Sequence, residues 1–92
     1  GEKGTLQTIL CCIPENDGPG VITGTMDGSI YTWNGKKLDK ILPKIAPGPI
    51  YSLCAFNTGY VFGGKFGNVT ILTNQLAVLR YISFHILCIK NV

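Results

Sequence analysis

The chain has 92 residues, a formal net charge of +3, and 46% hydrophobic against only 14% charged residues. This balance excludes a disordered, solvating chain, because so apolar a sequence commits most of its residues to buried surfaces. The modest positive charge permits an acidic partner surface without demanding one.

The first half of the chain contains four short runs of strand-forming residues. Each run is about five or six residues long and is bounded by turn formers, as expected for antiparallel sheets. The expected strands are residues 8–13, 21–25, 29–33 and 38–42. The first two are separated by a loop, residues 14–20, that is dense in Pro, Gly, Asn and Asp.

The second half repeats this organisation. Four strands are expected at residues 49–55, 60–64, 68–72 and 77–82, with a shorter turn at residues 57–59 in place of the long loop. A ninth run follows at residues 86–90, where ILCI resembles the ILCC of residues 9–12. Helical periodicity with capping residues is absent from the sequence, so no helix is predicted.

A spacing repeats inside the chain. The segment GVITGTMDGSIYTW, residues 20–33, returns 39 positions later without a gap as GYVFGGKFGNVTIL, residues 59–72. A period near forty, built from four short strands, is typical of β-propeller blades, which need neighbours to bury their faces. We therefore predict an all-β fold in which residues 1–47 and 48–84 are consecutive four-stranded antiparallel blades and residues 85–92 begin a third, as part of a larger propeller.

Glycines mark the turn between the second and third strands of each blade. Gly28 and Gly67 are expected to supply the positive backbone torsions of a tight hairpin. The segment 63–67, GGKFG, also invites comparison with a phosphate-binding loop, but it lacks the GxxxxGK[ST] spacing and a following helix. A hairpin turn is the favoured interpretation, with Gly63 and Gly67 as structural residues.

These motifs resemble known repeats. The stretch from Thr23 to Trp33 is similar to the core of a WD repeat. The elements GPIYS at residues 48–52 and GGK at residues 63–65 narrow the resemblance to the echinoderm microtubule-associated protein-like family, over about residues 7–72. That resemblance implies a WD-type β-propeller.

The resemblance also implies a role for three residues of the first blade. Thr25, Asp27 and Trp33 would be members of the hydrogen-bonded tetrad that stabilises a WD repeat. The chain departs from the family pattern at residues 46–49, which read APGP where the histidine of the next interblade loop is expected. Neither blade ends its third strand with the Trp-Asp dipeptide. These losses indicate atypical, degenerate blades.

The function implied by the resemblance is a non-enzymatic interaction module of a microtubule-associated protein, which binds tubulin or scaffolds microtubule-linked complexes. The alternative is a WD-repeat scaffold unrelated to microtubules, since fold does not fix partner. A propeller enzyme would need clustered acids or histidines, and the chain has five acidic residues and one histidine. No catalytic, cofactor-binding or metal-binding residue is predicted.

Location and other partners follow from the same observations. The N-terminus lacks the charged flank and apolar core of a signal peptide, and no apolar run approaches the ~20 residues of a membrane span. We expect a cytoplasmic protein of the microtubule cytoskeleton, with the cilium as one setting. Trp33 with Tyr31, Tyr51 and Tyr60 could stack on bases, but blade packing explains them, so neither nucleic acid nor membrane is an expected partner.

Four lysines are the candidate partner-binding residues. Lys36, Lys37, Lys40 and Lys44 fall in one short stretch around the turn between the third and fourth expected strands. They could form a basic patch that attracts an acidic surface such as that of tubulin. The favoured interpretation is a solvated strand edge, where lysine prevents pairing with another chain.

The cysteines and the histidine carry the remaining alternatives. Cys11, Cys12, Cys54 and Cys88 lie in apolar runs without zinc-site spacing, so buried, reduced side chains are expected. His85 could act as a base for Cys88. Residues three apart on a strand point to opposite faces, however, which favours a packing role for His85.

Overall fold

The computed structural model describes residues 6–65 and 67–83, and the regular structure within them is entirely β-strand. Every strand boundary lies within one residue of the expected position, so the all-β prediction is confirmed. The eight strands are β1 (Ile9–Pro14), β2 (Val21–Thr25), β3 (Ile30–Asn34), β4 (Lys37–Leu42), β5 (Ile50–Phe56), β6 (Gly59–Gly64), β7 (Asn68–Thr73) and β8 (Val78–Ser83). The expected ninth strand, with His85 and Cys88, lies outside the described residues.

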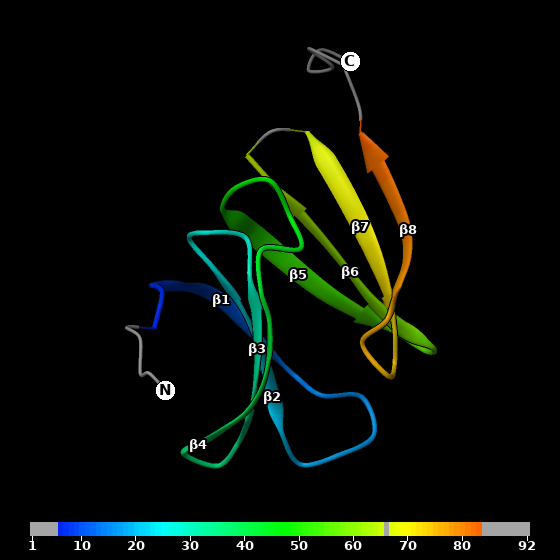
Figure 1. Cartoon of the computed structure of the whole chain (residues 1–92). Coiled ribbons are helices and arrows are strands. Elements are labelled where there is room, and N and C mark those ends of the chain that lie inside the picture. The colour runs from blue at the N-terminus through cyan, green and yellow to red at the C-terminus, as the bar shows by residue number, and fades with distance from the viewer. Residues whose placement is uncertain (1–5, 66, 84–92) are drawn as a thin grey trace.

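The strands form two separate antiparallel sheets (Figure 1). The N-terminal sheet has the order β1-β2-β3-β4 and the C-terminal sheet the order β5-β6-β7-β8. Their register is interrupted at equivalent places, since each has one irregularity in its first strand pair and one in its last. The 39-residue sequence repeat is therefore also a structural repeat, down to its bulges.

The two sheets pack face to face, with β5 lying against β1 and β2 (Figure 1). Alternate residues of each strand point into this contact, which is why the core is built from one face of each sheet. Each fully buried large apolar side chain there contributes about 1.5–3 kcal/mol to stability. The core comprises Ile22, Ile30, Ala46, Ile50, Leu53, Tyr60, Phe62 and Leu72.

A glycine allows a close approach between the sheets. A Cβ atom at Gly24 would lie 2.6 Å from Cγ2 of Ile50 and 3.0 Å from Sγ of Cys11. Beside it, the Cys11 thiol donates a hydrogen bond to the Ile50 carbonyl oxygen across the contact, at 3.4 Å. The absence of a side chain at Gly24 thus sets how tightly β5 packs on the N-terminal sheet.

The outer faces of the two sheets carry the apolar side chains that the core does not use. On the N-terminal sheet the register places Val21, Leu38 and Ile41 on the outer face, where each is 37–48% exposed. On the C-terminal sheet the outer face carries Val61 and Ile71, which are half-buried. Within residues 6–65 and 67–83, each sheet therefore keeps one mostly apolar face that the other sheet does not cover.

This arrangement corrects the expectation that the cysteines are buried. Cys12 pairs with Thr23 and Cys54 with Val61, both on outer faces, and both cysteines are exposed. Of the three cysteines in the described part of the chain, only Cys11 points toward the core, where it is half-buried, and all three have free thiols. The expectation was wrong for Cys12 and Cys54 because strand alternation sends them to the uncovered faces.

Thiol labelling tests this placement. Burial raises the pKa of the Cys11 thiol, as does the charge of Cys12, and these effects outweigh the opposing hydrogen bond at the Gly24 backbone. Because the thiolate is the reactive form, we expect maleimide to modify Cys12 and Cys54 at least tenfold faster than Cys11 at pH 7. Peptide mapping by mass spectrometry after timed quenching resolves the three sites. Equal rates would contradict the assignment of faces.

Candidate functional site

The turn between β2 and β3 is held by hydrogen bonds among two side chains and one backbone N–H group. Thr25 Oγ1 donates to Asp27 Oδ1 at 2.7 Å, and the Ser29 backbone N–H reaches both Thr25 Oγ1 at 3.0 Å and Asp27 Oδ1 at 3.2 Å. Gly28 has φ +87°, and a side chain there would collide with the Ala46 carbonyl oxygen. The turn thus requires glycine and packs closely against the segment that leads into β5.

The environment of Asp27 favours its charged form. Desolvation alone would raise the pKa of this carboxyl group. Hydrogen bonds from the Ser29 and Thr25 side chains and from the Ser29 backbone, together with the charge of Lys44, outweigh desolvation and hold the pKa below its ordinary value. The carboxylate is therefore a structural acceptor for the turn.

The lowered pKa predicts a pH dependence of stability. A carboxyl group whose pKa is lower in the folded state stabilises the fold above its unfolded pKa of about 3.9, and this contribution is lost as pH falls through the folded pKa. The Asp27→Asn variant should therefore lose stability near neutral pH and show a shallower decline between about pH 5 and pH 2. Urea unfolding followed by Trp33 fluorescence at several pH values measures this, and parallel pH profiles for variant and parent would contradict it.

Trp33 belongs to a different hydrogen-bond group from the one that the WD-repeat resemblance implies. Its indole Nε1 donates to Thr23 Oγ1 at 3.0 Å, and the Thr23 hydroxyl donates to the Tyr31 carbonyl oxygen at 3.2 Å. The Tyr31 and Trp33 rings also meet edge to face, with centroids 6.2 Å apart. The structure therefore separates Trp33 from Thr25 and Asp27 and makes Thr23 its partner.

The strand register explains this difference. Val21 pairs with Trp33 and Thr23 pairs with Tyr31, so the Thr23 hydroxyl is the diagonal neighbour that a long indole side chain can reach. Thr25 lies four residues beyond the cross-strand partner of Trp33, a separation of roughly 13 Å along a strand. The hairpin register alone was sufficient to identify Thr23.

The corresponding turn of the C-terminal sheet has phenylalanine, residue 66, at the sequence position of Asp27. Gly67 has φ +74° and lies between β6 and β7, which pair as a hairpin, so the hairpin interpretation is confirmed for this segment. A Cβ atom at Gly63 would find ordinary contacts at 3.5 Å and 3.8 Å, whereas one at Gly64 would collide with the Pro49 carbonyl oxygen. The spatial requirement for glycine in this sheet therefore falls on Gly64 and not on Gly63.

The four candidate lysines are all exposed, and they follow the length of β4. Lys36 and Lys37 lie at the β3–β4 turn, Lys40 lies within β4, and Lys44 follows the strand with φ 44°. At about 3.3 Å per strand residue, Lys37 and Lys44 are roughly 20 Å apart, which is more than twice the Debye length of about 8 Å at physiological salt. They form a line of charge along an outer edge strand.

The two sheets are also joined by Asn16, a residue whose role no sequence pattern indicated. Asn16, in the β1–β2 loop, donates from its backbone N–H to the Tyr60 hydroxyl at 2.7 Å. Its side-chain Nδ2 reaches the Phe56 carbonyl at 2.8 Å, the Gly59 carbonyl at 3.2 Å and Asn74 Oδ1 at 2.7 Å. Asn16 thus joins three loops, and the only sequence signal was the unequal length of the first loop in the two halves.

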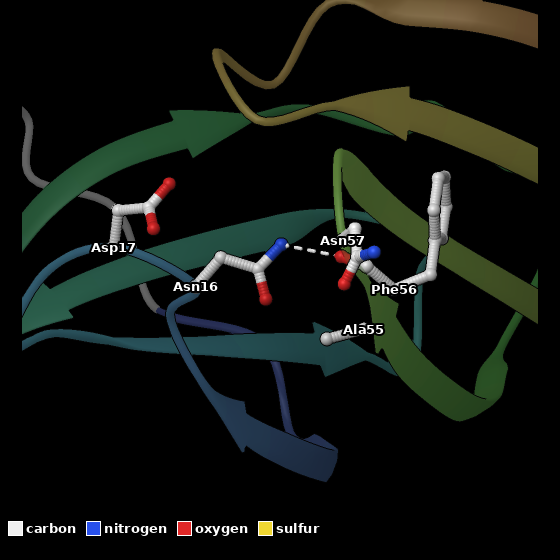
Figure 2. Close-up of a pocket in the computed structure, with 5 residues that line it drawn as sticks. All are labelled: Asn16, Asp17, Ala55, Phe56 and Asn57. Carbon is white, nitrogen blue, oxygen red and sulfur yellow. Dashed lines mark hydrogen bonds between the residues drawn. The ribbon is translucent and has the colours of Figure 1, made fainter.

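A pocket opens beside Asn16, between the β1–β2 loop and the β5–β6 turn (Figure 2). Its volume is about 330 Å³, and its lining residues are Asn16, Asp17, Ala55, Phe56 and Asn57. Figure 2 shows Asp17 and Phe56 on opposite sides, with the Asn16 side chain directed across the space toward the β5–β6 turn. The pocket combines a carboxylate, two amides and an exposed aromatic ring.

The remaining aromatic residues and the metal-binding residue types add no further site. Tyr31 and Tyr60 are 4% and 1% exposed, which confirms their packing role, whereas Tyr51 is 54% exposed. Among residues 6–65 and 67–83, no group of three His, Cys, Asp or Glu residues lies close enough to hold a metal ion. The same part of the chain contains no helix of the length and hydrophobicity needed to cross a membrane.

Comparison with solved structures identifies the architecture. No protein-family model matches the sequence. The fold is similar to the crystal structure of the RRP9 WD40 repeats, with a TM-score of 0.73 over 90% of this chain and 17% sequence identity. This chain spans 28% of the length of that one. The two sheets are therefore consecutive WD40-type propeller blades.

Proposed function

We propose that the chain is part of a WD-type β-propeller that serves as a non-enzymatic interaction module of a microtubule-associated protein, similar to the echinoderm microtubule-associated protein-like family. The observation that carries this proposal is the pair of WD40-type blades. Their polar side chains lie mainly in turns and along one edge strand, whereas their faces are mostly apolar. A rigid frame that presents loops and edges suits binding. Its place of action would be the cytoplasmic microtubule array.

Equivalent positions in the two blades support completion of the propeller by further blades. Ile22 and Ile30 of the N-terminal sheet face inward and pack on the C-terminal sheet. Their counterparts 39 residues later, Val61 and Val69, lie on the outer face of the C-terminal sheet. This outer face thus repeats the surface that already receives a neighbour. The natural occupant is another blade of the same polypeptide.

The line of lysines along β4 supports an acidic partner, for which tubulin is our candidate. Exposed charges spread over roughly 20 Å along an edge strand suit an extended acidic surface better than a single anion. Such charges act mainly on the association rate and lose their effect as salt increases. The sheet edge would therefore guide the partner, and shape would complete the contact.

Co-sedimentation with microtubules tests this function. The pairs Lys36→Gln with Lys37→Gln, and Lys40→Gln with Lys44→Gln, each lower the net charge by two. We expect each pair to weaken binding by about threefold to tenfold, more at low salt than at high salt. The matched control, Thr58→Glu with Gln75→Glu, makes the same charge change on exposed turns of the other sheet and should leave binding within about twofold.

Two results would contradict the proposal in different ways. Binding that survives both lysine pairs would remove these residues from the contact. Absence of binding by the parent chain, within its intact propeller, would remove tubulin as the partner. The second candidate function, a WD-type scaffold for complexes unrelated to microtubules, would then be favoured, since the fold alone admits it. Affinity for purified tubulin against a panel of other purified proteins separates the two candidates.

A further inference from the structure

The pocket beside Asn16 differs in chemistry from the lysine-bearing edge. The β1–β2 loop carries Glu15 and Asp17, two of the five acidic residues of the chain. The Glu15 carboxylate is partly engaged, because its Oε1 accepts a hydrogen bond from the Gly20 N–H at 3.2 Å. Asp17 is exposed and lines the pocket. None of the five lining residues is cationic, so the pocket presents negative charge on a chain whose net charge is positive.

The floor of the pocket is held in place before any ligand arrives. The four hydrogen bonds of Asn16, from 2.7 to 3.2 Å, tie the β1–β2 loop to the turns after β5 and β7. They use both donor groups of the residue. Among the described residues no donor reaches Asn16 Oδ1, so this acceptor faces the space that Figure 2 shows. A preorganised site loses less free energy in ordering its loops on binding.

Two of the lining residues, Ala55 and Phe56, carry apolar side chains. Phe56 is 42% exposed, and Ala55 beside it is also exposed. The Phe56 ring lies close to Gly59, since a Cβ atom there would be 3.1 Å from its Cζ. The exposed part of the ring offers an apolar surface next to polar acceptors.

From this combination we propose that the pocket binds a short extended peptide segment in which a basic residue is followed by an apolar one. The cationic head pairs with the Asp17 carboxylate, the apolar side chain rests on Phe56, and the amides of Asn16 and Asn57 meet the peptide backbone between them. The volume of about 330 Å³ is near the lower end of the range of about 300–1,000 Å³ for ligand pockets, which suits one or two side chains and not a large cofactor. This site is independent of the lysine-bearing edge and of tubulin.

The test is an NMR titration of the full ¹⁵N-labelled chain with an acetylated, amidated hexapeptide, Gly-Ser-Arg-Leu-Ser-Gly. We expect the backbone amide signals of Asn16, Asp17 and Asn57 to shift. Replacing the arginine of the peptide by glutamine, or its leucine by serine, should each weaken binding by about threefold, the size expected for one exposed ion pair or one partly buried apolar contact. A peptide in which glutamate replaces the arginine should not bind.

Two protein variants complete the test. Asp17→Asn removes the carboxylate from the pocket and should weaken binding of the arginine peptide by about threefold. The matched control, Asp39→Asn, removes the same charge from exposed β4 and should change the affinity by less than about 1.5-fold. An unchanged ¹⁵N spectrum outside the substitution confirms that each variant is folded.

Three outcomes would overturn the proposal. Equal weakening by Asp17→Asn and Asp39→Asn would show attraction to net charge only. Equal affinity for the arginine and glutamine peptides would show that no ion pair with Asp17 contributes to binding. Signal shifts that cluster away from the β1–β2 loop and the β5–β6 turn would place the contact elsewhere. None of these outcomes depends on microtubule binding, which co-sedimentation measures separately.

Discussion

Replacing Gly24 with alanine will lower the free energy of unfolding by about 2 kcal/mol, the usual cost of adding a methyl group to a tightly packed contact. The new Cβ would lie 2.6 Å from Ile50 Cγ2, and Ile50 is fully buried between the sheets. The sheets must separate or Ile50 must leave its position. Equilibrium unfolding in urea, followed by the fluorescence of the single tryptophan, measures the change.

Gly63→Ala is the matched control for this substitution. Gly63 is the counterpart of Gly24 in the repeat, but a Cβ there meets only ordinary contacts at 3.5 Å or more. The variant should be neutral or up to about 1 kcal/mol more stable, since alanine loses less backbone entropy than glycine in a strand. If Gly63→Ala destabilises the chain as much as Gly24→Ala does, the cause is not the collision with Ile50.

A double substitution tests the collision directly. Ile50→Ala alone removes a fully buried side chain and should cost about 2–5 kcal/mol, but it also removes the Cγ2 atom that Gly24→Ala would strike. The double variant should therefore be more stable than the sum of the two effects implies, by about 1 kcal/mol or more. Additive effects would contradict the assignment. In a longer polypeptide, Gly63→Ala should become destabilising if a further blade packs on it.

Replacing Asn16 with alanine will also destabilise the chain by about 2 kcal/mol, because three acceptors lose their shared donor and the loops lose their connection. Asn16→Asp should cost more, since a carboxylate oxygen would then face the Phe56 and Gly59 carbonyls. For a domain of this size, 2 kcal/mol corresponds to a decrease of about 10 °C in Tm. Circular dichroism at 215 nm during heating measures it.

Asn57→Ala provides the control for the Asn16 substitutions. Asn57 lines the same pocket and is exposed, and it makes no hydrogen bond to any other described residue. Its replacement should change Tm by less than about 2 °C, as for most exposed positions. If Asn57→Ala and Asn16→Ala have the same effect on Tm, the hydrogen bonds of Asn16 make no specific contribution to stability.

The strands and turns could be predicted from the sequence because their causes are local. Short runs bounded by Gly, Pro, Asn and Asp fix where each strand begins and ends, and Gly28 and Gly67 adopt the positive φ that a tight hairpin needs. The bond between Thr25 and Asp27 spans two residues and is local in the same sense. For these features, one repeat contains all the information.

The functional geometry depends on contacts between repeats, and there the sequence was less informative. Asn16 resembles any other loop asparagine until Tyr60 and Asn74, 44 and 58 residues away, are brought beside it. The exposure of Cys12 and Cys54 depends on which face of each sheet is covered, a fact that alternation alone does not reveal. The partner of Trp33 is intermediate, since register could have identified Thr23 where the family resemblance pointed to Thr25.

The two sheets contact each other through different surfaces. The N-terminal sheet contributes Ile22 and Gly24, whereas the C-terminal sheet contributes Ile50 and Phe62 from non-equivalent positions of the repeat. Such a heterologous contact cannot be reproduced by two identical surfaces related by a two-fold axis. Copies of this unit that associated through it would add head to tail, and the rotation per step would decide between a closed ring and an open helical fibre.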